Sequence, residues 1–308
     1  MINIVMLVQG AAQTPPPGGP PPGFSSSKAL MQLTQFVGYF LAIGAVGFCF
    51  GVVRRARISD EAKRVLRADN AAMLGMVGVL LVALALLGDP FLQGLAQSKA
   101  FAESLPKNLG PLELKLAMLA LALVGFALVR AVPSIGWTLA TIGVLVAVLQ
   151  PLYTGKLAGK VNAVHILAAS TWLGTLLVLA LIGIRGVIRS NSAGAQRARL
   201  VADLVSSFSP LALTAATIVA ITGITTAWLH LKRISALYTT SYGIALLVKL
   251  ALVAVVLLFG ALNWRRVGPS LGSEGSEETI RRSAKMELAF AALVLIATSV
   301  LVTLPSPR

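Results

Sequence analysis

The stretch Val161–Ile184, VNAVHILAASTWLGTLLVLALIGI, decides the fold of this chain because it contains no acidic or basic residue. A helix of about 20 apolar residues is long enough to cross the ~30 Å hydrocarbon core of a bilayer. The run also holds His165, one of two histidines in the chain, and Trp172, seven residues later and on the same expected helix face. A titratable ring inside a membrane span is rare, so His165 is a candidate functional residue. The alternative is a ring that hydrogen-bonds to a neighbouring helix.

The composition of the 308-residue chain is that of a multi-pass membrane protein, since 56% of its residues are hydrophobic and 12% are charged. Soluble domains carry about twice this charged fraction. The net charge of +15 does not indicate a nucleic-acid partner, because the basic residues fall between apolar spans. The single cysteine, Cys49, excludes a disulfide within the chain, and a cysteine-rich zinc cluster is excluded as well.

Eight apolar spans predict an all-α fold, a polytopic bundle of eight transmembrane helices in the lipid bilayer. In lipid only helices and closed barrels satisfy the backbone, and the uninterrupted apolar runs lack the alternation of barrel strands. The predicted spans are about 29–53, 71–88, 111–130, 134–152, 161–184, 208–230, 241–263 and 286–304. Residues 1–28, which include the run Pro15–Gly23, are predicted to form a disordered proline-rich tail in the periplasm.

The distribution of Lys and Arg predicts the orientation of the bundle. Connections around residues 54–70, 130, 185–207 and 264–285 carry 16 of these residues, and the other side carries eight. The positive-inside rule places the richer side in the cytoplasm. The chain is therefore expected in the bacterial inner membrane with both termini in the periplasm.

Similar motifs recur at a nearly constant offset and predict an internal duplication. Gln35 and His165 each stand nine residues before a glycine, and the Lys-Leu-Ala triplet at Lys115 recurs at Lys249. The separation along the chain is nearly the same for both pairs. Four spans in each unit is an even number, so the two repeats would be parallel. The predicted repeats are residues 29–152 and 153–308.

Polar and sulfur-bearing side chains gather in the outer halves of the predicted spans, where a metal or cofactor site would face the periplasm. Imidazole and thioether groups suit copper, and thioethers favour Cu(I). The alternatives are core packing for the methionines, a solvated interfacial position for His230, and snorkelling or pairing with Glu113 for Lys249. The candidate metal ligands are His165, His230, Met31 and Met118, and further candidate site residues are Trp172, Gln35, Lys249 and Glu113. The chain has no phosphate loop and no nucleophile elbow, so enzyme activity is not expected.

One family pattern runs through roughly residues 155–305. Its elements are His165 to Gly174, Phe208-Ser209, Thr222-Gly223, Tyr242-Gly243, Leu246 to Leu250, Asn263 and Glu287. In these residues the chain resembles the copper resistance D (CopD) family of bacterial membrane proteins. The resemblance implies an eight-helix protein of copper uptake or homeostasis, often acting beside a periplasmic CopC-type copper-binding partner.

The chain departs from this pattern at three places. Gln35 stands where members often carry a histidine, Leu149-Gln150-Pro151 stands where they carry Gly-His-Ala, and Gly174-Thr175 replaces a Gly-Gly pair. The spacing of His165 and Trp172 also resembles that of HemJ-type haem-binding membrane proteins. Haem b, with His165 and His230 as candidate axial ligands, is therefore the alternative to copper. A non-catalytic subunit of a membrane complex is the third hypothesis.

Overall fold

The computed structural model describes residues 25–56, 69–96, 110–189, 194–231, 233–267 and 276–304. Within these ranges the chain is helical, and eight helices are long and apolar enough to cross a membrane. The predicted all-α bundle with eight membrane-spanning helices is confirmed. The predicted tail lies outside the described residues up to position 24, and Ser25 caps the first helix by accepting a hydrogen bond from the Lys28 backbone N–H.

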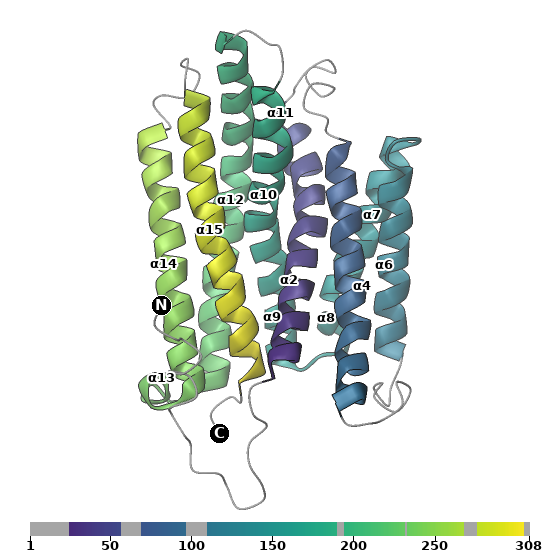
Figure 1. Cartoon of the computed structure of the whole chain (residues 1–308), viewed down its shortest axis with the longest axis vertical. Helices are drawn as coiled ribbons and strands as arrows, with labels where there is room; N and C mark the ends of the chain where they lie inside the picture. The colour runs from purple at the N-terminus through teal and green to yellow at the C-terminus, as the bar shows by residue number, and fades with distance from the viewer. Residues whose placement is uncertain are drawn as a thin grey trace, which may run out of the picture.

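The helices run alternately up and down, so the beginning of the first span and the end of the last lie at the same end of the bundle (Figure 1). The first half comprises α2 (Ser26–Gly47) with the π-helical turn η1 (Phe48–Val53), α4 (Asn70–Ala96), α6 (Gly110–Leu128), α7 (Pro133–Leu149) and the short α8 (Pro151–Thr154). The fifth span comprises α9 (Leu157–Ala169), η2 (Ser170–Gly174), α10 (Thr175–Val178), η3 (Leu179–Ile184) and α11 (Arg185–Ile188). The last spans are α12 (Gly194–Leu231), α14 (Ser241–Val267), which follows the short α13 (Ala236–Thr239), and α15 (Ser276–Thr303).

The first and fifth spans are the most buried of the eight and form the centre of the bundle. They meet where a Cβ added at Gly44 would overlap the Gly174 carbonyl oxygen, and one added at Gly174 would overlap that of Phe40. Small residues at a crossing let two membrane helices pack backbone against backbone, which is the main source of attraction between helices in lipid. The glycine that the sequence pattern places nine residues after His165 therefore fixes this central contact.

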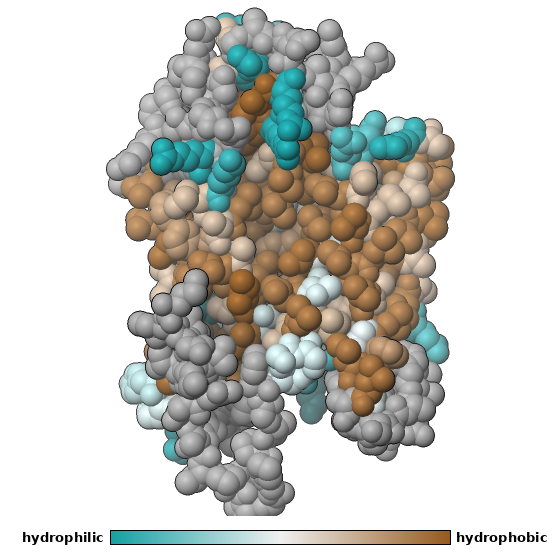
Figure 2. Space-filling view, viewed as in Figure 1, coloured by the Kyte–Doolittle hydropathy of each residue, from teal (hydrophilic) through white to brown (hydrophobic). Residues whose placement is uncertain are grey.

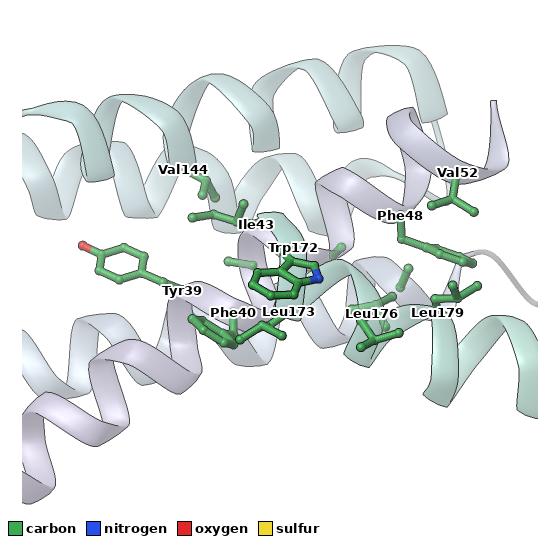
Figure 3. Packing of buried hydrophobic residues seen from close by; sticks show 14 of the residues in the cluster. Tyr39, Phe40, Ile43, Phe48, Val52, Val144, Trp172, Leu173, Leu176 and Leu179 are labelled. Atoms are coloured by element: carbon green, nitrogen blue, oxygen red, sulfur yellow. The ribbon is translucent and has the colours of Figure 1, made fainter. Parts of the chain in front are cut away.

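Trp172 lies beside this crossing and is only 8% exposed. Figure 3 shows its ring among Phe40, Ile43 and Leu173, with Val144 of α7 close by. The indole fills the space between the first and fifth spans, so the predicted site residue Trp172 is part of the core.

The central helices contain three π-helical turns: η1 in the first span, and η2 and η3 in the fifth. Ser170 begins η2 and Thr175 follows it, and both side chains are fully buried. Within the described residues neither hydroxyl has a hydrogen-bond partner. Thr175 packs so closely on Gly47 that a Cβ there would overlap its hydroxyl. The centre of the fifth span therefore departs from regular α-helical geometry.

A wide hydrophobic band surrounds the bundle, with hydrophilic residues above and below it (Figure 2). Exposed arginines follow α2, α6 and α11 at one end, and they are Arg54, Arg55, Arg130 and Arg189. Exposed aromatic residues lie at the other end, and they are Tyr153, Trp228 and Tyr238. Aromatic rings concentrate at the membrane–water interface, so these three side chains mark one boundary of the bilayer.

Two helix boundaries differ most from those predicted. The sixth and eighth helices begin at Gly194 and Ser276, several turns before the predicted starts at positions 208 and 286. Apolar periodicity reports only the part of a helix that lies in lipid. The added turns contain charged residues, which are good helix formers at a surface. Both helices therefore extend beyond the bilayer on the arginine-rich side.

Candidate functional site

His165 lies in the second half of α9 and faces α12. Its Nδ1 is 2.9 Å from Oγ1 of Thr222. His165 stands eight residues after Leu157, the first residue of α9, so it lies about 12 Å from the start of that helix. The side chain is half-buried in a place where an unpaired polar group would be costly.

The hydrogen bonds of Thr222 define which ring nitrogen carries the proton. Its hydroxyl lies 2.6 Å from the Ile218 carbonyl oxygen, which can only accept, so the hydroxyl hydrogen is donated there. The Thr222 oxygen then accepts from Nδ1–H of His165. A neutral imidazole with its proton on Nδ1 carries a lone pair on Nε2. The ring is therefore in the tautomer that can bind a metal through Nε2.

Gly223 makes room for this ring. A Cβ added at Gly223 would lie 3.3 Å from Cε1 of His165, which is tighter than ordinary van der Waals contact. The Thr222-Gly223 pair of the family pattern thus has two functions in the structure. Thr222 supplies a hydrogen bond and Gly223 supplies space.

His230 lies further out on α12 and has different partners. Its Nδ1 is 2.8 Å from the Thr226 carbonyl oxygen of the same helix, and its ring stacks on Tyr242 of α14 at a centroid distance of 6.0 Å. The ring therefore lies more than one helical turn from that of His165. Two imidazoles that share one metal ion must each lie about 2 Å from it. His165 and His230 do not form such a pair, nor an axial pair across one haem.

The two candidate methionines lie on other faces of the bundle. Sδ of Met31 is 2.8 Å from the position that a Cβ on Gly88 of α4 would occupy, so this thioether packs between α2 and α4. Met118 lies on α6, where its carbonyl approaches Gly143 of α7, and its side chain packs against the main core. The structure gives both methionines a packing role. Neither is brought to the face of α12 that carries Thr222.

Two other polar candidates are tied into the first half. Gln35 hydrogen-bonds to Tyr39, one turn further along α2. Gln150, at the end of α7, donates to the Pro111 carbonyl at the start of α6. Within the described residues, no three His, Cys, Asp or Glu side chains gather closely enough to hold a metal ion.

The expected pairing of Glu113 with Lys249 does not occur in the structure. Glu113 is exposed on α6, and Lys249 is half-buried on α14. Figure 1 shows α6 and α14 at opposite sides of the bundle. The prediction was wrong because depth along a helix can be read from sequence, whereas the order of helices around the bundle cannot.

Comparison with known proteins agrees with the family pattern in the second half. Residues 202–301 match the family model described as Copper resistance protein D (CopD). The copper transport protein CutJ of Bacillus subtilis (strain 168) is 32% identical over 143 residues. The alignment covers 46% of this chain and 24% of CutJ, so the chain spans about a quarter of the length of this relative. No solved structure matches the chain.

The family match begins after His165 but includes Thr222 and Gly223, which contact its ring. It covers most of α12, all of α14, with Tyr242 and Lys249, and α15 as far as residue 301. The resemblance read from the sequence is confirmed over the last three spans: this chain is a multi-pass membrane protein whose residues 202–301 match the copper resistance protein D (CopD) family.

Proposed function

We propose that this protein handles copper at the inner membrane and that His165 supplies a copper ligand through Nε2. The contact of Nδ1 with Thr222 carries this proposal, because it leaves Nε2 with a free lone pair. A hydrogen bond from the non-ligating nitrogen is the usual way in which proteins orient a metal-binding histidine. The name of the relative CutJ, a copper transport protein, agrees with this role.

The donor set fits a copper ion in transit. The structure offers one well-oriented imidazole at this position, and thioether groups lie elsewhere. A transport site must bind its ion strongly enough to admit it and weakly enough to release it. A single protein ligand meets this requirement, and the remaining copper ligands would come from the molecule that delivers the ion. A periplasmic CopC-type protein is the proposed donor.

Substitution of the two histidines tests the proposal. The purified protein would be loaded with Cu(I) that is buffered by the chelator bicinchoninate, and bound copper would be measured. We expect His165→Ala to lose copper, and His230→Ala, the matched control on α12, to retain most of it. Ala is well tolerated in a membrane helix, so the His165 variant should still insert and fold.

The alternative hypotheses give different results. A Soret band in the absorption spectrum of the purified protein would indicate haem. Equal copper content in the wild-type protein and the His165→Ala variant would reject the proposed ligand. No copper and no haem in the wild-type protein would favour a non-catalytic subunit of a membrane complex.

A further inference from the structure

Lys249 is a positive charge deep in a membrane span for which the proposed function has no role. It stands eight residues after Ser241, the first residue of α14, so it lies about 12 Å inside the outer end of that helix. His165 lies at the same depth in α9. An ionisable side chain at such a depth is costly and is usually retained for a function.

The contacts between α12 and α14 near Tyr242 show the level of the bundle at which Lys249 lies. The two helices are antiparallel, and the stacked rings of His230 and Tyr242 set their register at the outer end. One turn inward, Ala245 and Leu246 of α14 lie in the same cluster as Ala227 of α12. Two turns inward from the stacked rings lie Lys249 on α14 and Gly223 on α12. Lys249 is seven residues from Tyr242, and Gly223 is seven residues from His230, so each lies on the same face of its helix as that ring.

Gly223 is the residue against which the His165 ring rests, at 3.3 Å from an added Cβ. The two helices therefore bring the Lys249 side chain to the level of that ring.

No carboxylate lies at this level on the helices that surround the site. Along α9, α12 and α14, which the structure describes throughout, the one acidic residue is Asp203, about 28 Å from Thr222 along α12. Glu287 of α15 lies beside Gly260 of α14, because its Oε1 is 2.9 Å from the position of an added Cβ there. Gly260 is about 16 Å further along α14 than Lys249, so the Glu287 carboxyl lies well away from the depth of Lys249. His165 and Thr222 are polar side chains at about the depth of Lys249.

We propose that Lys249 is a tethered cation that competes with a copper ion for the space beside the His165 imidazole, so that bound copper is released rather than retained. This inference rests on the proposed copper site. Two positive charges a few ångströms apart in a partly buried site repel each other strongly. The long, flexible side chain of Lys249 can lie near the empty imidazole and swing toward the outer interface when copper enters.

The experiment measures Cu(I) affinity of the full chain in lipid nanodiscs by competition with bicinchoninate. Lys249→Met keeps the length of the side chain and removes its charge, and Lys249→Arg keeps the charge. Lys115→Met is the matched control, because Lys115 is also half-buried but lies on α6, on the other side of the bundle. Size-exclusion profiles and thermal unfolding confirm that each variant is folded.

We expect Lys249→Met to bind Cu(I) at least about tenfold more tightly than the wild-type protein and to release it more slowly. Lys249→Arg and Lys115→Met should resemble the wild-type protein. Unchanged or weaker binding by Lys249→Met overturns the inference, and weaker binding would show that Lys249 neutralises an anion. Equal effects of the Met and Arg variants would also overturn it, because packing rather than charge would then be responsible.

The His165→Ala variant separates this inference from the proposed function. If it binds as much copper as the wild-type protein, the site itself is rejected and the role of Lys249 is rejected with it. If it loses copper while Lys249→Met behaves like the wild-type protein, the copper site stands and only the competing cation is rejected.

Discussion

The imidazole of His165 illustrates how one side chain obtains a defined chemical state inside a membrane. Its Nδ1 donates to Oγ1 of Thr222 on α12, and the Thr222 hydroxyl donates in turn to the Ile218 carbonyl. In hydrocarbon there is no water to compete for these bonds, so the tautomer is held firmly. The nitrogen that remains, Nε2, is the one that can accept a ligand.

Removal of the Thr222 hydroxyl should therefore weaken copper binding without removing the ligand. We expect Thr222→Val to lower Cu(I) affinity by about 10- to 100-fold, the usual effect of losing a partner of a metal-binding histidine. Chelator competition measures the affinity, and nitrogen NMR of labelled histidine reports the tautomer.

Thr225→Val provides the control for this substitution. Thr225 is exposed on the same helix, and within the described part of the chain its hydroxyl bonds only to the Ile221 carbonyl of α12. An equal loss of affinity in both variants, or none in either, would contradict the role of Thr222.

The site residues show what sequence can and cannot provide at this scale. His165 is recognisable because a titratable ring in an apolar span is rare. Its contact with Thr222 is not, because these residues are 57 positions apart and their helices could have packed in many ways. The family pattern already contained Thr222-Gly223, and this was the signal that could have identified the partner.

At the scale of the helices, the crossing of the first and fifth spans positions everything else. Its tightness comes from Gly44 and Gly174, where any side chain would overlap the backbone of the other helix. Association of helices in lipid depends on such close packing rather than on the hydrophobic effect.

A methyl group at position 174 should separate these helices. We expect Gly174→Ala to destabilise the folded protein by about 1–3 kcal/mol, the usual range for overpacking, because the Phe40 carbonyl cannot move away easily. Thermal unfolding in detergent measures the change.

The control for this prediction is Gly159→Ala in α9, where the nearest atom to an added Cβ is 4.0 Å away. That substitution should be neutral or slightly stabilising, since Ala is the better helix former. A Gly174→Ala protein as stable as the control would show that the crossing is not tightly packed.

The helices also show why the predicted elements were only partly correct. Long apolar runs identified all eight spans, because the bilayer imposes a minimum length on each helix. The starts of α12 and α15 were missed because helix outside the membrane leaves no apolar signal. The turns η1, η2 and η3 were missed because a π-helical turn arises from packing and has no simple residue pattern.

For the whole molecule, we propose that the chain consists of two parallel four-helix repeats. One contact supports this. Gly44 and Gly174, which occupy corresponding places in the two repeats, meet at the centre. In the same register Gln35 of the first repeat corresponds to His165 of the second.

The proposed repeat predicts that a second ligand can be introduced into the first half. Gln35→His would place an imidazole at the position that corresponds to His165, in the outer half of α2. We expect copper binding to rise, with the stoichiometry moving toward a second ion per chain, as measured by metal analysis of the purified protein. Gln32→His, three residues away on the same helix, is the control. A similar rise in both variants would show that any added histidine binds copper and would remove this support for the repeat.

The proposed orientation of the molecule in the membrane follows from its two unlike ends. Described arginines cluster after α2, α6 and α11, whereas the exposed rings of Tyr153, Trp228 and Tyr238 lie at the opposite end. Over the full sequence, Lys and Arg are twice as frequent in the connections on the arginine-rich side as in the connections and tails on the other. A side rich in positive charge stays in the cytoplasm during membrane insertion.

This asymmetry predicts that both termini face the periplasm. It also predicts that His165 lies in the periplasmic half of the bilayer. Fusions of a reporter that is active only in the cytoplasm should be active at Ser192 and Gly275 and inactive after Arg308. Alkaline phosphatase fusions, which are active only in the periplasm, should show the reverse pattern. Alkaline phosphatase activity of the fusion at Ser192 would show that the molecule has the opposite orientation. The His165 site would then open toward the cytoplasm, and a periplasmic protein could not deliver copper to it directly.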